Sequence, residues 1–291
     1  ARMLEQQKDL VVLEHCALRK PRKGWIYAGK ISYEEKKVLG SGSAGTIVFK
    51  GMHDDREVAV KRVLKQCIQL VMRERKALLD TDSHENIIRY HGTTIDKNFR
   101  YIALELCMAS LNDFVKKKKE LNISLTQKEI LLQATKGLAH LHSFVNPIVH
   151  RDLKPENILF CNRGGTVRVV ISDFGLSKQV RDDMSVLSNG SGVVGTPGWM
   201  SPEALNEQKL SSKTDIFSLG CILYFVLTEG SHPFGDHVLE RPGRIRKGQY
   251  RLKGLPSSES SHLITLAISH IPALRPPAIS ILSNPFFWES K

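Results

Sequence analysis

The residues best suited to chemistry stand in one short stretch, His150-Arg-Asp-Leu-Lys-Pro-Glu-Asn157. It combines a carboxylate, an ammonium and an amide, which suits phosphoryl transfer because that reaction depends on positioning and on stabilising negative charge. Asp152 would accept or orient the proton of an incoming hydroxyl, Lys154 would balance the charge of the transferred phosphate, and Asn157 would offer an oxygen to magnesium. We expect His150 to be a packed, hydrogen-bonded residue and not a general base.

A second acid follows a predicted turn at 162–165 and an apolar strand at 167–171. This residue, Asp173, begins the tripeptide Asp-Phe-Gly. A hard cation prefers oxygen ligands, so Asp173 and Asn157 together predict a magnesium site. Either string can arise by chance, but both in this order, behind a glycine-rich loop and a strand-end lysine, form a specific signal.

The glycine-rich loop contains Gly40, Gly42 and Gly45 in the spacing GxGxxG, and Ile47 stands where valine often follows. Glycine lets backbone amides approach phosphate oxygens because no Cβ stands in the way. The pattern is weak by itself, since any tight hairpin can carry three glycines. Strand signals follow it, and not the helix that a dinucleotide-binding fold requires.

Lys61 ends the apolar strand Val58-Ala-Val-Lys61, where a charge is costly to bury unless it is paired. Glu74, on a helix predicted at 68–79, is its natural partner, and the ammonium would also reach the phosphates of ATP. A strand-end lysine that reaches solvent and a surface acid are the plain alternatives for either residue alone. Their joint position behind the glycines favours the functional pair.

The elements that must position these residues change in character along the chain. Strand patterns dominate from Tyr33 to Val63 and return at 101–106, and helical patterns dominate afterwards. The capping-box pattern Thr126–Glu129 opens one helix, and the nearly apolar run 215–228 predicts a buried helix. These signals predict an α+β fold of two lobes with a cleft between them, a small β-rich lobe and a larger helical lobe.

The predicted boundaries divide the chain into three parts. Residues 1–29 form a flanking segment, 30–107 the N-terminal lobe with its hinge, and 108–291 the C-terminal lobe. No stretch approaches the roughly 18 consecutive apolar residues of a membrane helix. We therefore expect this chain to be soluble.

The cysteine pattern argues against a disulfide framework or a zinc site, and favours a reducing compartment. The five cysteines are odd in number, scattered and never spaced as CxxC. We expect them to be small buried hydrophobic residues. They are Cys16, Cys67, Cys107, Cys161 and Cys221.

The net charge of +12 raises a nucleic-acid alternative. Basic residues gather at 19–23, 116–119 and 241–253, but no aromatic residues interleave the lysine run. We expect mainly solvated surface there. RNA binding stays open as an accessory role, and it would weaken steeply with salt and on neutralising residues 116–119.

Together these motifs resemble the protein kinase superfamily from about Tyr33 to Trp288, and the lysine at 154 resembles its serine/threonine members. Ser201-Pro-Glu203 stands where that family usually has Ala-Pro-Glu, and Arg275 is similar to its usual ion-pair partner. Asp215 matches the acid that holds the catalytic loop.

The loop Gly195-Thr-Pro-Gly-Trp199 resembles a serine/threonine substrate-docking loop. The resemblance implies that Thr196 contacts Asp152 and Lys154. The chain departs from the family's pattern at Pro197, at Ile271 and in the basic stretch 241–253. The last two departures leave the partner surfaces of the C-terminal lobe open, and not the ATP site.

Longer strings resemble the kinase domain of the inositol-requiring enzyme family, the unfolded-protein-response sensors. The strings span residues 45–51, 57–62, 101–107, 137–143, 171–176, 228–235 and 284–288. The resemblance implies a parent with a luminal sensor, one membrane span, and this kinase on the cytosolic face of the endoplasmic reticulum membrane. An endoribonuclease would begin where this chain ends, after Lys291. Nucleotide binding and trans-autophosphorylation in a homodimer would switch that endoribonuclease on.

The resemblance also assigns the adenine pocket. Backbone groups of Glu105 and Cys107 would bond adenine, Ala59 would form the roof, and Leu104 would be the gatekeeper. The ligands implied are ATP or ADP with Mg²⁺.

Three serines of a Gly/Ser-rich stretch are predicted phosphosites. They are Ser185, Ser188 and Ser191. Phosphate there would pair with Arg151 or Arg181 and order the loop. The alternative is a flexible loop that happens to contain serines.

The predicted function is therefore an ATP-dependent serine/threonine protein kinase that phosphorylates itself, in the stress sensor described above. The alternative is a nucleotide-binding pseudo-enzyme, a dimerisation scaffold with little phosphoryl transfer. Lys61, Asp152, Asn157 and Asp173 are all intact, which favours catalytic competence.

Overall fold

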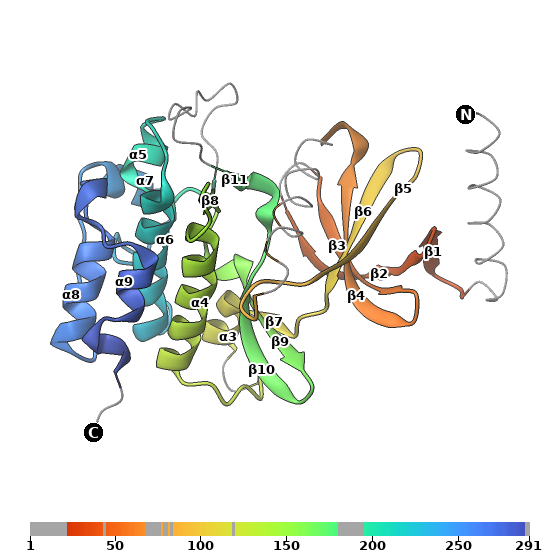
Figure 1. The fold of residues 1–291 in the computed structure, drawn as a ribbon, viewed down its shortest axis with the longest axis horizontal. Helices are drawn as coiled ribbons and strands as arrows, with labels where there is room; N and C mark the ends of the chain where they lie inside the picture. The colour runs from red at the N-terminus through yellow and green to blue at the C-terminus, as the bar shows by residue number, and fades with distance from the viewer. Residues whose placement is uncertain are drawn as a thin grey trace. The chain divides into compact units, whose positions relative to one another are not determined.

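The computed structural model describes residues 22–42, 45–67, 77, 81, 84–117, 120–179 and 195–288 (Figure 1). Contacts divide the chain into two units. The first comprises residues 1–75 and 89–106, and the second comprises 76–88 and 107–291. The first unit is built on a β-sheet and the second is mainly helical, which confirms the predicted α+β class.

The first unit contains a six-stranded antiparallel sheet with the strand order β1-β2-β3-β4-β6-β5. Its strands are β1 (Trp25–Ala28), β2 (Ile31–Ser41), β3 (Ile47–His53), β4 (Arg56–Leu64), β5 (Tyr90–Ile95) and β6 (Phe99–Glu105). A short 3-10 turn, η1 (Lys65–Cys67), follows β4. The turn between β3 and β4 contains Asp54, whose φ is 52°.

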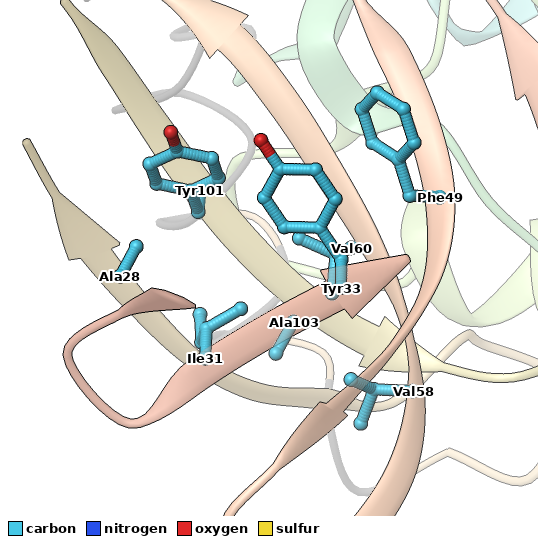
Figure 2. Close-up of a cluster of buried hydrophobic side chains, with 8 residues drawn as sticks. All are labelled: Ala28, Ile31, Tyr33, Phe49, Val58, Val60, Tyr101 and Ala103. Atoms are coloured by element: carbon cyan, nitrogen blue, oxygen red, sulfur yellow. The ribbon is translucent and has the colours of Figure 1, made fainter. Parts of the chain in front are cut away.

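One face of this sheet is covered by a hydrophobic cluster (Figure 2). The rings of Tyr33 and Phe49 pack in a tilted arrangement with centroids 4.6 Å apart. Val58 and Val60 of β4 are fully buried in the same cluster. Because successive side chains of a strand point to opposite faces, Ala59 and Lys61 lie on the other face.

The second unit is built mainly from helices (Figure 1). They are α3 (Leu111–Lys116), α4 (Gln127–His142), α5 (Pro202–Leu205), α6 (Ser212–Leu227), α7 (Arg241–Arg246), α8 (Ser258–Ala267) and α9 (Ala278–Leu282). Helix α4 packs against α9, and α6 packs against α8. None of the helices in the described residues is both long and apolar enough to cross a bilayer.

Two helix predictions are confirmed. Thr126 caps α4 through a capping box with Glu129, as its spacing predicts. In α6, every residue from Thr214 to Val226 is buried. That helix ends at Leu227, and Gly230 then takes a φ of 116°, a conformation that favours glycine.

Short strands and 3-10 turns in the second unit carry the predicted catalytic stretch, residues 150–157. The strands are β7 (Ala109–Ser110), β8 (Ile148–Val149), β9 (Ile158–Arg163), β10 (Thr166–Ile171) and β11 (Lys178–Gln179), and the turns are η2 (Pro155–Asn157), η3 (Phe174–Leu176), η4 (Pro272–Leu274) and η5 (Pro285–Phe287). The β9–β10 hairpin separates Asn157 from Asp173 in sequence and returns the chain so that Ser172 N donates to Asn157 O at 2.9 Å.

The expectation that the five cysteines form no disulfide is wrong for two of them. Cys107 and Cys161 form a disulfide, although 54 residues separate them. The cause lies in the sheet: β7 pairs with β9, and the pair Ala109–Phe160 brings the neighbouring cysteines together. Cys221 is free and buried in α6, as expected.

Candidate active site

The catalytic stretch is held from below by a buried carboxylate. Asp215 of α6 accepts hydrogen bonds from the backbone N–H of His150 at 2.8 Å and of Arg151 at 2.9 Å. His142 Nε2 lies 2.9 Å from the same carboxylate. Burial alone would raise the pKa of Asp215, but the hydrogen bonds and the nearby histidines hold it below its usual value. Asp215 therefore stays ionised and fixes the loop that carries Asp152.

Asp152 is the centre of a small network of polar side chains. Lys154 Nζ donates to Asp152 Oδ2 at 2.8 Å and to Thr196 Oγ1 at 2.6 Å. The Thr196 hydroxyl in turn donates to Asp152 Oδ1 at 2.6 Å. The docking-loop threonine thus contacts both residues that the sequence resemblance assigned to it. The bond from Thr196 shows that the Asp152 carboxylate can accept a hydrogen bond from a hydroxyl group.

The amide of Asn157 is oriented by the same carboxylate. Its Nδ2 donates to the backbone O of Asp152 at 2.8 Å and to Oδ2 at 3.3 Å. Within the described residues, nothing donates to Asn157 Oδ1. Asp173 lies two residues after the end of β10, with a left-handed φ of 63°. The residues thus offer a carbonyl oxygen and a carboxylate, a set that fits a hard cation such as Mg²⁺.

His150 is a packed residue, as expected. It is fully buried, its Nε2 lies 2.8 Å from the carbonyl O of Ser172, and its ring meets Phe174 edge to face at 5.2 Å between centroids. Its imidazole therefore links the catalytic stretch to the Asp-Phe-Gly segment.

The docking loop is anchored to α6, and a buried ion pair holds α5. Ser218 Oγ donates to the backbone O of Trp199 at 2.7 Å. Below it, Arg275 forms two hydrogen bonds with Glu203, at 2.6 and 2.8 Å. Burial alone would raise the pKa of Glu203, but Arg275 holds it below its usual value. The ion pair that the resemblance implied is present and almost fully buried.

The first unit contains the glycine loop and the strand lysine that were predicted to bind ATP. On β4, Ala59 and Lys61 share the face opposite the hydrophobic cluster, and Lys61 is only 8% exposed. Gly45 has a φ of 71°, which only glycine adopts readily, and the N–H of Gly42 closes the hairpin onto Thr46 O at 2.9 Å. Gly40 lies at the end of β2, paired with Val48.

The structure shows which aliphatic residue after the glycine loop shares the face of Lys61. Ile47, which fits the valine position of the sequence pattern, pairs with Arg62 and packs against the cluster on the opposite face. Val48 pairs with Lys61, so its side chain lies on the lysine face. A one-residue change of register moves a side chain to the other side of a sheet, and a motif alone does not fix that register.

The predicted adenine contacts fall in both units. Leu104 is buried in β6, opposite Ala59, and Glu105 ends that strand. The N–H of Glu105 donates to Arg89 O at 3.0 Å, so an adenine contact would use its carbonyl. Cys107 belongs to the second unit. The adenine roles of Glu105, Cys107 and Ala59 stay predictions.

Comparison with known proteins identifies the family. The family model for the protein kinase domain matches residues 33–287. The chain belongs to the protein kinase family. It is 45% identical over 278 residues to the serine/threonine-protein kinase/endoribonuclease ire-1 of Caenorhabditis elegans, a match that covers 92% of this kinase and 28% of the nematode protein.

Two further relatives agree. The human serine/threonine-protein kinase/endoribonuclease IRE2 is 45% identical over 89% of this kinase and 29% of the human protein. The sensor for unfolded proteins in the ER, ire1, of Schizosaccharomyces pombe is 40% identical over 87% and 26%. The chain spans less than a third of these relatives. The predicted kinship with kinases of the inositol-requiring type is confirmed.

Several predicted residues lie outside the described part of this kinase. They are Glu74, Arg181, Ser185, Ser188 and Ser191. The pairing of Glu74 with Lys61 and the three phosphosites therefore stay predictions. Sequence reasoning also missed His142; the available signal was a second histidine close to the end of a helix whose apolar face is otherwise Leu138 and Leu141.

Proposed function

We propose that this kinase transfers the terminal phosphoryl group of ATP to serine or threonine hydroxyls. The observation that carries the proposal is the network around Asp152, in which one carboxylate receives an ammonium, a hydroxyl and an amide. A carboxylate so placed orients an incoming hydroxyl and takes its proton.

Each neighbour of Asp152 has a role in that step. Lys154 lies beside the carboxylate and offers positive charge to the phosphoryl group as it moves. Thr196 holds the docking loop against Lys154 and Asp152. On the first unit, Lys61 is assigned to the ATP phosphates, with Glu74 as its partner.

Asn157 and Asp173 would hold Mg²⁺, because the amide N–H groups of Asn157 are used internally and its oxygen has no donor among the described residues. A bound cation would supply positive charge against the negative charge of the phosphates. The hydrogen bonds from Asn157 Nδ2 to Asp152 fix the orientation of the amide that would bind the cation.

The names of the relatives extend the proposal to the parent protein. The worm and human proteins are named kinase/endoribonucleases, and the fission-yeast protein is named a sensor for unfolded proteins in the ER. We assign this chain to the cytosolic kinase module of such a sensor, which would phosphorylate itself in a homodimer at Ser185, Ser188 and Ser191. Because the catalytic residues are intact, the pseudo-enzyme alternative is not favoured.

The decisive test is replacement of the central carboxylate. Asp152→Asn keeps the shape of the side chain, and it should lower phosphate incorporation by about 10²- to 10⁴-fold, the usual contribution of a general base. Nucleotide binding should persist, because Asp152 is not assigned to ATP. Asp54→Asn, at an exposed turn, is the control. Incorporation that persists in Asp152→Asn at the wild-type rate would refute catalysis by this site.

A further inference from the structure

The side chain of Arg241 lies directly against the docking loop. Gly198 has a φ of 97°, and a Cβ at this position would stand 3.1 Å from Cδ of Arg241 and 3.8 Å from its Nη1. The arginine side chain therefore covers the backbone of Gly198, two residues after the threonine that contacts Asp152. Glycine permits this approach, because a Cβ at this position would crowd the Arg241 side chain.

The position of Arg241 is fixed by backbone carbonyls and not by an acid. Its Nε donates to Gly235 O at 2.8 Å and its Nη2 to Asp236 O at 3.3 Å. Within the described residues, no carboxylate lies within ion-pair distance of it. Asp236 and Glu156 act on it only from farther away, and both are exposed to solvent. The positive charge at the docking loop is thus held in place but not neutralised.

The surface that continues from Arg241 is also basic. Residues 241–253 contain six arginines and lysines and no acid. Counting partners in the described part of the chain, only Arg244 has an ion pair there, with Glu240 at 2.7 Å, while Arg246 bonds to the carbonyl of Leu205. Lys247, Arg251 and Lys253 are exposed, with no ion pair to any described residue. We define residues 241–253 as the basic face.

The chain itself contains a matching acceptor segment. Between Gly175 and Glu203 the only acids are Asp182 and Asp183, and they stand three and two residues before Ser185. A serine entering the site near Thr196 would bring such acids toward the docking loop and Arg241. Opposite charges at a half-buried site select partners more than they add raw affinity.

We propose that Arg241 and the basic face select acceptor segments with acidic residues just before the phosphorylated serine, and that the segment 181–191 of a second copy is one such acceptor. The proposal rests on the proposed kinase activity and adds its specificity. Glu156, an exposed acid in the catalytic stretch, would by itself favour acceptors with basic residues. Selection by Arg241 and selection by Glu156 therefore predict opposite peptide preferences.

The test compares three peptides as substrates of the full chain. The first has the native sequence of residues 181–191, the second carries Asn in place of Asp182 and Asp183, and the third carries Arg in both places. We expect kcat/KM to be about fivefold higher for the native peptide than for the Asn peptide, as for two partly exposed charge contacts. The difference should appear mainly in KM and shrink toward one in 0.5 M salt, because exposed charges are screened.

The variant Arg241→Gln should lower the native-to-Asn ratio to about one. Since a folding defect would slow both peptides equally, the ratio reports on selectivity alone. Arg168→Gln, which removes one charge from β10 in an ion pair with Glu85, is the matched control and should keep the ratio.

The outcomes separate the two proposals. A wild-type preference for the Arg peptide, or a ratio that Arg241→Gln leaves unchanged, would overturn the assignment of Arg241 while leaving kinase activity intact. If neither the peptides nor the chain itself incorporate phosphate, the proposed function fails, and the specificity with it.

Discussion

Replacing Glu203 with glutamine tests how much the buried ion pair supports the second unit. Arg275 is 1% exposed, and its guanidinium meets the Glu203 carboxylate at both oxygens. Removing one partner of a buried pair leaves the other charge without compensation, which costs about 3–5 kcal/mol. Glutamine keeps one acceptor oxygen, and Arg275 keeps its bond to Ser269 O at 2.8 Å, so we expect about 3 kcal/mol, the lower end of that range.

The assay is urea unfolding followed by fluorescence. With a slope of about 2 kcal/mol/M, a loss of about 3 kcal/mol lowers the midpoint by roughly 1.5 M. The control is Glu240→Gln, because the Glu240–Arg244 pair has a similar 2.7 Å contact but side chains 54% and 45% exposed. That exposed pair should cost less than about 0.5 kcal/mol. Equal midpoints for the two variants would refute the argument from burial.

The same pair sets a pH dependence. The folded pKa of Glu203 is lowered, so its contribution to stability is present above the unfolded pKa and is lost as the pH falls through the folded value. Wild-type stability should thus decline below about pH 4.3, the ordinary glutamate range, and Glu203→Gln should decline less.

A double variant, Glu203→Leu with Arg275→Met, should be more stable than either single change. If the double variant is the least stable of the three, the desolvation argument is wrong.

Three further predictions concern single features. Val48→Phe should raise the KM for ATP about tenfold while Ile47→Phe does not, because only Val48 shares the face of Lys61; equal effects would contradict the register. Thr196→Val should lower kcat about tenfold and leave ATP binding unchanged, since it removes two hydrogen bonds at the catalytic carboxylate; unchanged turnover would speak against that network. Reducing the Cys107–Cys161 disulfide should destabilise the second unit by up to about 4 kcal/mol, from the 54-residue loop that it closes. Alkylation without reductant followed by mass spectrometry checks the bond itself. Modification of Cys107 and Cys161 in that experiment would show that the bond is absent.

The candidate catalytic residues could be proposed from sequence because such roles depend on residue type and order, and their catalytic roles stay predictions. Asp152, Lys154 and Asn157 lie in one stretch, so local spacing already implied that they act together. The register of the strands could not be predicted in the same way. Whether Ile47 or Val48 shares the face of Lys61 depends on the pairing of β3 with β4, and the glycine motif does not specify that pairing.

Contacts between distant segments were also out of reach. The Cys107–Cys161 bond follows from the pairing of β7 with β9, which no cysteine spacing suggests. His142 has the helical position of a core residue, and only the path of the chain brings it to Asp215, 73 residues later. Where the resemblance supplied such a long-range pair, as for Glu203 and Arg275, the structure contains it.

The carboxylate of Asp215 has a consequence for regulation. It projects from a helix in which thirteen successive residues, Thr214 to Val226, are buried, and it holds the N–H groups of His150 and Arg151. Those two amides can exchange with deuterium only when their hydrogen bonds to this buried carboxylate break, so they should be among the slower amides of the protein. A switch that turns this enzyme on and off cannot work by moving that platform at low cost, and must act on parts of the chain that α6 does not hold.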